Sequence, residues 1–274
     1  MSLFGRLLGR HRPRWQEAWQ TYPGWVEGAA AEWSVDLGAV DAAPIANLPV
    51  RLDVEARHPP EPHAAPGRPE PHAAPGRPGP AAAPGLPGAA DDPRLAELEQ
   101  LVAAVAADLG GSFVGRVARA GSWRLTAHLP AMPTEPVSLA WRGDRELDIR
   151  AEFDPHWAYV RDRLAPDERQ SQLLTDLALL GVLAEQGDEL ATPRQVEHVA
   201  YFARADPAES AAADLRADGF SASVERDDEG EFALTAFRRD PVAPPSLHEV
   251  TWAVKETVER HGGSYDGWNC AVTT

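Results

Sequence analysis

The sequence has little cysteine and no long hydrophobic run. Cys270 is the only cysteine among 274 residues, which excludes an intramolecular disulfide and a multi-cysteine zinc site. A single cysteine is typical of a reducing compartment, and we expect a cytoplasmic location. No stretch approaches the roughly 20 apolar residues that span a bilayer, so we expect no membrane span. Residues 1–14 are a basic tail in which Gly5 and Arg6 interrupt the apolar residues, unlike a signal peptide.

Positive charge is also scarce. Lys255 is the only lysine, and 42 acidic residues stand against 26 basic ones, giving a formal net charge of -16. Proteins that bind nucleic acid neutralise phosphates with clustered lysine and arginine. The acidic balance therefore argues against direct nucleic-acid binding and favours a basic protein partner.

Proline, glycine and alanine dominate residues 58–88. The stretch PEPHAAPGR occurs there twice, at 60–68 and again at 69–77. Such a segment cannot bury enough apolar surface to fold, so the sequence predicts a disordered insertion. His63 and His72, one in each repeat, could be considered metal ligands. Two histidines on a flexible chain make a poor site, and we expect neither a metal nor a cofactor.

Residues 15–165 show the pattern of an α+β domain with an antiparallel sheet. From Val50 to Glu55 apolar and charged residues alternate, as in a half-buried strand. Short connections between such stretches imply antiparallel neighbours. Strands are expected at 32–37, 49–56, 112–118, 123–129, 137–141 and 146–153.

Helices should cover one face of this sheet. Asp92 and Pro93 predict the start of a helix that ends at Gly110, and Asp154 caps another that Pro166 stops. Residues 166–190 should form a connecting helix. Its apolar positions are leucines: Leu173, Leu174, Leu177, Leu180 and Leu183.

The order of elements becomes regular in residues 191–274. Strands are expected at 198–204, 220–226, 231–239 and 264–272. One helix follows Asp206 as its cap, and a second starts at Ser246, whose spacing to Glu249 fits a capping box. The order strand, helix, strand, strand, helix, strand is the ferredoxin-like βαββαβ arrangement. The sequence therefore predicts an α+β protein with two domains.

The last strand contains YDGWNC, Tyr265 to Cys270. The βαββαβ order together with YDGW resembles the regulator of ribonuclease activity B family. This resemblance implies a small acidic ferredoxin-like domain that binds a ribonuclease E-type endoribonuclease and restrains RNA cleavage. Residues 15–166 are similar to a bacterial domain of unknown function found beside such regulators, through their opening tryptophans and the stretches GLP, VGRV and FDPHW.

We therefore expect a non-enzymatic regulator with a protein partner. Its predicted partner-binding residues are Tyr265, Asp266, Gly267, Trp268, Asp227, Asp228 and Glu229. The three acids lie in a hairpin turn, where they could imitate RNA or simply keep a turn in solution. Trp268 could be an exposed anchor or a core residue, and the sequence leaves both interpretations open.

Other functions are weighed against this one. An enzyme could have its site in the N-terminal sheet, around Trp123, His128, His156 and Trp157. It would need the two histidines to lie in one polar pocket. A two-domain adaptor needs no such pocket.

A nucleophilic Cys270 needs a nearby base such as His261, whereas a small apolar filler does not. RNA could stack on four aromatic residues of the first and third C-terminal strands, Tyr201, Phe202, Phe232 and Phe237, although the basic pattern of RNA-recognition modules is missing.

Overall fold

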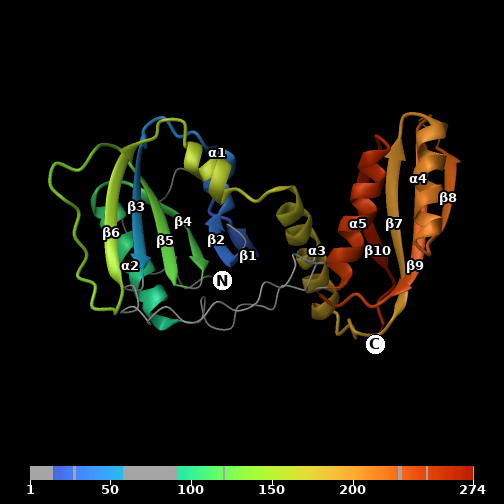
Figure 1. Cartoon of the computed structure of the whole chain (residues 1–274), viewed down its shortest axis with the longest axis horizontal. Helices are drawn as coiled ribbons and strands as arrows, with labels where there is room; N and C mark the ends of the chain where they lie inside the picture. The colour runs from blue at the N-terminus through green and yellow to red at the C-terminus, as the bar shows by residue number, and fades with distance from the viewer. Residues whose placement is uncertain are drawn as a thin grey trace, which may run out of the picture. The chain divides into compact units, whose positions relative to one another are not determined.

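The computed structural model describes residues 15–26, 29–57, 92–119, 121–227, 230–244 and 246–273. The basic tail and the predicted insertion at 58–88 lie outside these residues, as do Asp228 and Glu229. The chain divides into two compact units, Met1–Asp167 and Glu168–Thr274. Each unit contains one antiparallel sheet, which confirms the predicted α+β class (Figure 1).

The N-terminal unit contains six strands in the order β1-β2-β4-β5-β3-β6. Their bounds are β1 Trp19–Val26, β2 Ala29–Asp36, β3 Val50–Arg57, β4 Ser112–Arg119, β5 Ser122–Leu129 and β6 Glu146–Phe153. Helix α2, Pro93–Asp108, covers one face and buries Leu95, Leu98 and Val102 against it. Asp92 caps this helix as predicted, because its side chain accepts a hydrogen bond from the Arg94 amide at 3.0 Å. The short helix α1, Leu37–Ala42, and a π-helical turn, Val160–Leu164, complete the unit.

Two strand predictions differ from the structure. The sequence pattern does not indicate β1, because Pro23 and Gly24 interrupt its alternation. An edge strand tolerates proline because one side of its ladder is unpaired. The predicted strand at 137–141 is wrong, since these residues have no strand pairing. Their apolar side chains Val137, Leu139 and Trp141 pack on the core, which produces the alternation without a ladder.

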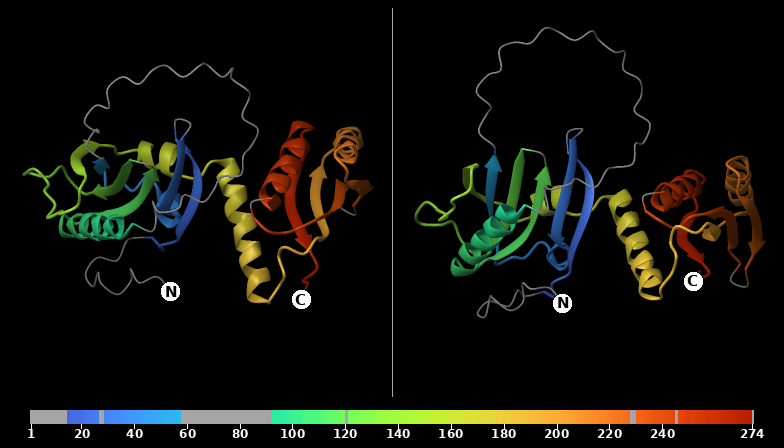
Figure 2. Two further views of the ribbon diagram at one scale, coloured as in Figure 1. Left: turned by 60° about the horizontal axis from the view of Figure 1, so that its bottom comes forward. Right: turned by 90° about the horizontal axis from the view of Figure 1, so that it is seen from below.

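The C-terminal unit has the ferredoxin-like arrangement that the sequence predicts. Its four strands lie in the order β10-β7-β9-β8, with bounds β7 Arg194–Phe202, β8 Ser221–Arg226, β9 Phe232–Asp240 and β10 Ser264–Cys270. Helices α4, Ala205–Ala217, and α5, Ser246–Arg260, lie on one side of this sheet (Figures 1 and 2). Helix α3, Glu168–Glu185, belongs to the same unit and contacts α5.

The helix starts differ in detail from the predicted caps. Asp206 does not cap α4: the helix begins at Ala205, its cap residue is Arg204, and Asp206 lies in the first turn. Glu249 does not complete a capping box with Ser246, because its carboxylate accepts from the Arg169 guanidinium at 2.8 Å. Opposite charge on a neighbouring helix competes successfully for this exposed side chain.

Candidate functional site

A buried carboxylate lies at the centre of the C-terminal unit. Asp176 on α3 is 1% exposed and accepts hydrogen bonds from four side chains. Its Oδ1 accepts from Gln172 Nε2 at 2.9 Å and Trp268 Nε1 at 3.0 Å, and its Oδ2 accepts from Thr251 Oγ1 at 2.7 Å and His248 Nδ1 at 2.9 Å. A buried charge is tolerated only when donors replace its water shell. These four donors supply that replacement and tie α3 to α5 and β10.

Trp268 is a core residue. Its side chain is 8% exposed and packs with Leu180 and Leu183 of α3, Val196 of β7 and Leu247 of α5. Because its indole N–H already donates to Asp176, the polar end of the ring is also engaged inside the unit. The core interpretation is confirmed, and the interpretation of Trp268 as an exposed anchor is wrong.

A β-bulge decides how the remaining residues of YDGW are presented. The register shifts between Tyr265 and Gly267, so Asp266 has no partner residue on β7, and Gly267 has a φ of 140° that favours glycine. The extra residue places Tyr265 and Trp268 on the same, helix-covered face. The Tyr265 hydroxyl bonds His198 Nδ1 at 2.8 Å, and burial raises the pKa of this tyrosine. Only Asp266 of the four presents an exposed side chain to solvent.

Asp227, the described member of the predicted hairpin acids, lies at the same end of the sheet as Asp266. Across the ladder, Ser264 pairs with Tyr201, and the adjacent Phe202 pairs with Phe232 next to the β8–β9 turn. With strands about 4.8 Å apart, β10 and β8 are roughly 14 Å apart at this end. Asp227 shapes the turn by accepting from the Glu231 amide at 2.8 Å. The structure therefore brings Asp227 and Asp266 to one end of the sheet, while Asp228 and Glu229 fall outside the described residues.

The four aromatic residues weighed for RNA stacking divide between the two faces. Phe202 and Phe232 pack into the core under the helices, whereas Tyr201 and Phe237 alternate onto the opposite face. Tyr201 pairs with Ala233 and Phe237 with Glu197, so the two rings are four ladder positions apart and not side by side. This arrangement lacks the paired aromatic platform of RNA-recognition modules.

Cys270 has no nucleophilic setting. Burial raises the pKa of its thiol, which disfavours the thiolate needed for attack. The candidate base His261 follows α5, before β10 begins, and its Nε2 lies 2.8 Å from the Asp214 carboxylate on α4. The cysteine packs beside Trp268 as a small apolar filler.

The histidines of the N-terminal unit do not share a pocket. His128 is completely buried on β5 and stacks on Trp157 with ring centroids 3.8 Å apart, whereas His156 is exposed. His128 Nδ1 and Trp157 Nε1 both donate to the Leu48 carbonyl at 3.0 Å. Burial lowers the His128 pKa to about 4, so the ring is neutral at pH 7. Trp123 faces the core beneath α2, and the four residues form no common catalytic pocket.

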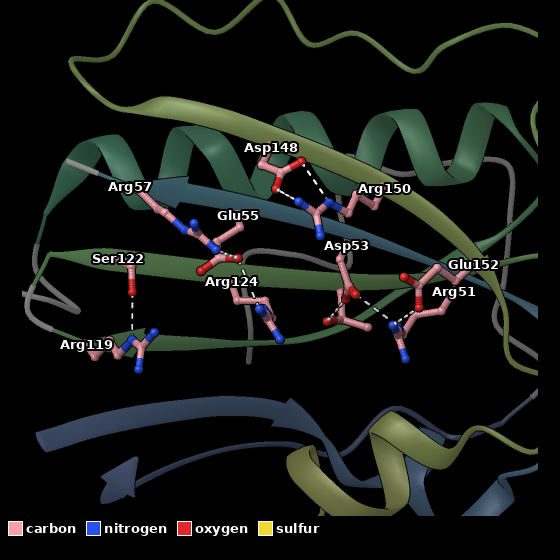
Figure 3. Close-up of polar contacts among 11 residues, drawn as sticks. Arg51, Asp53, Glu55, Arg57, Arg119, Ser122, Arg124, Asp148, Arg150 and Glu152 are labelled. Atoms are coloured by element: carbon pink, nitrogen blue, oxygen red, sulfur yellow. Dashed lines mark hydrogen bonds and ion pairs between the residues drawn. The ribbon is translucent and has the colours of Figure 1, made fainter. Parts of the chain in front are cut away.

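An ion-pair ladder covers the N-terminal sheet on the face opposite α2 (Figure 3). Arg51 and Asp53 pair along β3 at 2.8 Å, and Glu55 accepts from Arg57 at 2.6 Å and from Arg124 of β5 at 3.0 Å. Hydrogen bonding from Arg57, supported by Arg124, lowers the Glu55 pKa to about 2. These carboxylates are engaged with arginines across neighbouring strands. Part of this face is covered by Tyr159, whose ring centroid lies 4.9 Å from the Arg51 guanidinium and 5.6 Å from that of Arg124.

Neither a metal site nor a membrane-spanning helix occurs among the described residues. Within the described ranges, no three histidine, cysteine or acidic side chains lie close enough together to hold a metal ion. The helices of those ranges all fall short of the length and apolarity needed to cross a bilayer.

Comparison with known proteins identifies the C-terminal region. Residues 176–270 match the family Regulator of ribonuclease activity B. The resemblance seen in the βαββαβ order and YDGW is thus confirmed for this region. No curated protein matches the chain.

The match to Regulator of ribonuclease activity B runs from Asp176 on α3 to Cys270 at the end of β10. It therefore includes the whole four-stranded sheet, both covering helices, and the buried carboxylate with three of its four donors; Gln172 lies before the match. The family's description is that of a regulator of ribonuclease activity, and residues 176–270 are similar to it. The sequence analysis did not single out Asp176, the buried carboxylate that accepts hydrogen bonds from four side chains.

Proposed function

We propose that this chain is a non-enzymatic cytoplasmic regulator that binds a ribonuclease E-type endoribonuclease, inhibits its cleavage of RNA and so modulates RNA decay. The observation that carries the proposal is the family match over residues 176–270, which spans the entire ferredoxin-like sheet. A protein-binding role also suits a unit in which the residues with catalytic potential, Cys270 and His261, are engaged in packing and in a hydrogen bond.

The acidic end of the sheet is the proposed contact for the nuclease. Asp227 and Asp266 are its described members, and Asp228 and Glu229 adjoin Asp227 in the sequence. A nuclease must carry basic residues where RNA phosphates bind, so an acidic surface accelerates encounter and selects this partner. Tyr265, Gly267 and Trp268 act from within, because their packing and the bulge hold Asp266 out toward solvent.

The test is RNA cleavage by a purified ribonuclease E-type catalytic domain, titrated with the full chain. We expect dose-dependent inhibition that weakens as salt rises, because exposed charges are screened. The double variant Asp227→Asn and Asp266→Asn should raise the half-inhibitory concentration several-fold. A matched control, Glu209→Gln with Glu256→Gln, removes two exposed carboxylates from α4 and α5 and should inhibit like the unchanged chain. Cleavage that proceeds unaltered at saturating concentrations of the unchanged chain would refute the proposal.

A further inference from the structure

The C-terminal sheet has one face without a covering helix, and this open face offers a binding surface. Helices α4 and α5 pack on the other face and bury Val196, His198, Ala200 and Phe202 of β7. The alternating residues of the same strand point away from these helices. None of the residues on this second face is buried, although the two central strands run through its middle.

The middle of the open face is partly apolar and carries one carboxylate, that of Glu197, which pairs in register with Phe237. It is formed by side chains that are adjacent in the strand registers of β7, β9 and β8, namely Val199, Tyr201, Ala233, Thr235, Phe237, Ser221 and Ser223. Four strands of about eight residues cover roughly 27 by 19 Å. That area is on the scale of the ~800 Å² of surface that one partner contributes to a standard protein interface. The face is therefore large enough for a protein to dock.

One corner of the open face is hollowed and positively charged. A hollow of about 280 Å³ is lined by Gln195, Gly219, Ser221, Phe237, Arg238 and Arg239. Arg238 is engaged, because it donates to Asp240 at 2.8 Å and to the Asp218 carbonyl at 3.1 Å. Arg239 is exposed, and no other side chain of the described residues pairs with its guanidinium. The hollow thus presents an uncommitted cation beside an aromatic ring and an amide.

The two ends of the open face carry opposite charges. Arg239 pairs in register with Gln195 at the start of β7, whereas the acidic end with Asp227 and Asp266 lies where β7 finishes. Exposed Glu225 extends the negative charge onto the open face of β8. Phosphates would meet the carboxylates of Glu197, Glu225 and the acidic end, which disfavours RNA. A folded protein can match it, with basic residues over the acidic end and a carboxylate over the hollow.

We infer that the open face is the surface on which the endoribonuclease docks, with a carboxylate of that protein bound in the hollow beside Arg239. This inference rests on the proposed function and adds the location, orientation and chemistry of the contact. The acidic end supplies charge attraction, and the partly apolar middle supplies the buried area that makes binding specific.

The experiment measures binding of purified full-length ribonuclease E-type endoribonuclease to the immobilised full chain. Arg239→Glu reverses the charge of the hollow, and Thr235→Arg places a long side chain in the middle of the face. Each should raise Kd about tenfold or more. Ser223→Arg on β8 repeats the steric test at a fully exposed position. The matched control Arg142→Glu reverses an exposed arginine of the N-terminal unit and should leave Kd unchanged.

The outcomes separate the inference from the proposed function. If the unchanged chain binds and the folded variants bind equally well, the open face is not the docking surface, although the proposed function stands. If the unchanged chain does not bind, both are overturned. A single-stranded RNA probe is run alongside: RNA binding that Thr235→Arg abolishes would assign the face to RNA and overturn a protein partner there. Circular dichroism melting shows which variants are folded.

Discussion

Truncation of Trp268 tests whether the buried carboxylate and the last strand form one structural unit. Replacing a buried tryptophan with alanine typically costs about 3–5 kcal/mol of unfolding free energy, because apolar contacts are lost and a cavity remains. At Trp268 the cavity would open between α3, β7 and α5. The substitution also removes one of the two donors to Asp176 Oδ1, which adds about 1–3 kcal/mol. The total is a large fraction of the roughly 5–15 kcal/mol that stabilises an ordinary domain.

Trp268→Phe separates packing from hydrogen bonding. Phenylalanine keeps an aromatic ring in the site but has no N–H, so the expected loss is about 1–3 kcal/mol, the cost of an unmade bond to a buried charged acceptor. Asp176→Asn should be costly by itself, because an amide nitrogen replaces one acceptor oxygen. In the double variant the two losses should not add, and a coupling energy of about 0.5–3 kcal/mol is expected for groups in direct contact.

Hydrogen exchange read by mass spectrometry suits this measurement, since a two-unit chain need not unfold in one step. Peptides from β7 and β9 report the stability of the C-terminal unit, and peptides from β3 and β5 serve as an internal control. We expect Trp268→Ala to accelerate exchange in β7 and β9 and to leave β3 and β5 unchanged. Unaltered protection of β7 and β9 would show that the Trp268 side chain does not support this core.

Two further predictions concern single positions. His128 has a pKa of about 4 in the folded protein, below its unfolded value of about 6.5, so the unfolded state binds the proton first as pH falls. The free energy of unfolding of the N-terminal unit should therefore fall by on the order of 3 kcal/mol between pH 6.5 and pH 4. In urea titrations across that range, His128→Asn should make this dependence on pH less steep. An equally steep dependence in the variant would exclude His128 as its source. Gly267→Ala should cost about 1–3 kcal/mol through backbone strain alone, since an added Cβ meets nothing within 4 Å. Thermal melting checks this cost, and a variant as stable as the unchanged chain would show that the bulge accepts other residues.

The C-terminal topology could be predicted because its local signals agree. Glycines after the helices and period-two alternation in the strands mark every element of the βαββαβ order. The N-terminal sheet was harder, since β1 contains Pro23 and residues 137–141 alternate for packing without pairing. Both differences arise because a sequence pattern records burial, whereas a strand also requires a neighbouring strand to pair with.

The candidate site was less accessible to sequence reasoning. Trp268 and the bulge at Gly267 were recognised, but the partner of the indole was not, because it lies 92 residues earlier on α3. A signal was present: Leu173, Asp176, Leu180 and Leu183 follow helical spacing, so an acid occupies a position of the apolar stripe. A carboxylate on the buried side of a helix requires buried donors, and the sequence alone cannot say which residues supply them.

The position of Asp176 sets the extent of the regulatory unit. Judged by the βαββαβ order alone, the unit would begin near β7 at Arg194, and α3 would be a connection to it. Without α3, the Trp268, His248 and Thr251 donors would all face the space left by one carboxylate, and Leu180 and Leu183 would be missing from the core around Trp268. With α3 absent, water would reach these donors, and the apolar surface of Trp268, Val196 and Leu247 that packs on α3 would be exposed, which destabilises the sheet. The compact C-terminal unit therefore begins with α3.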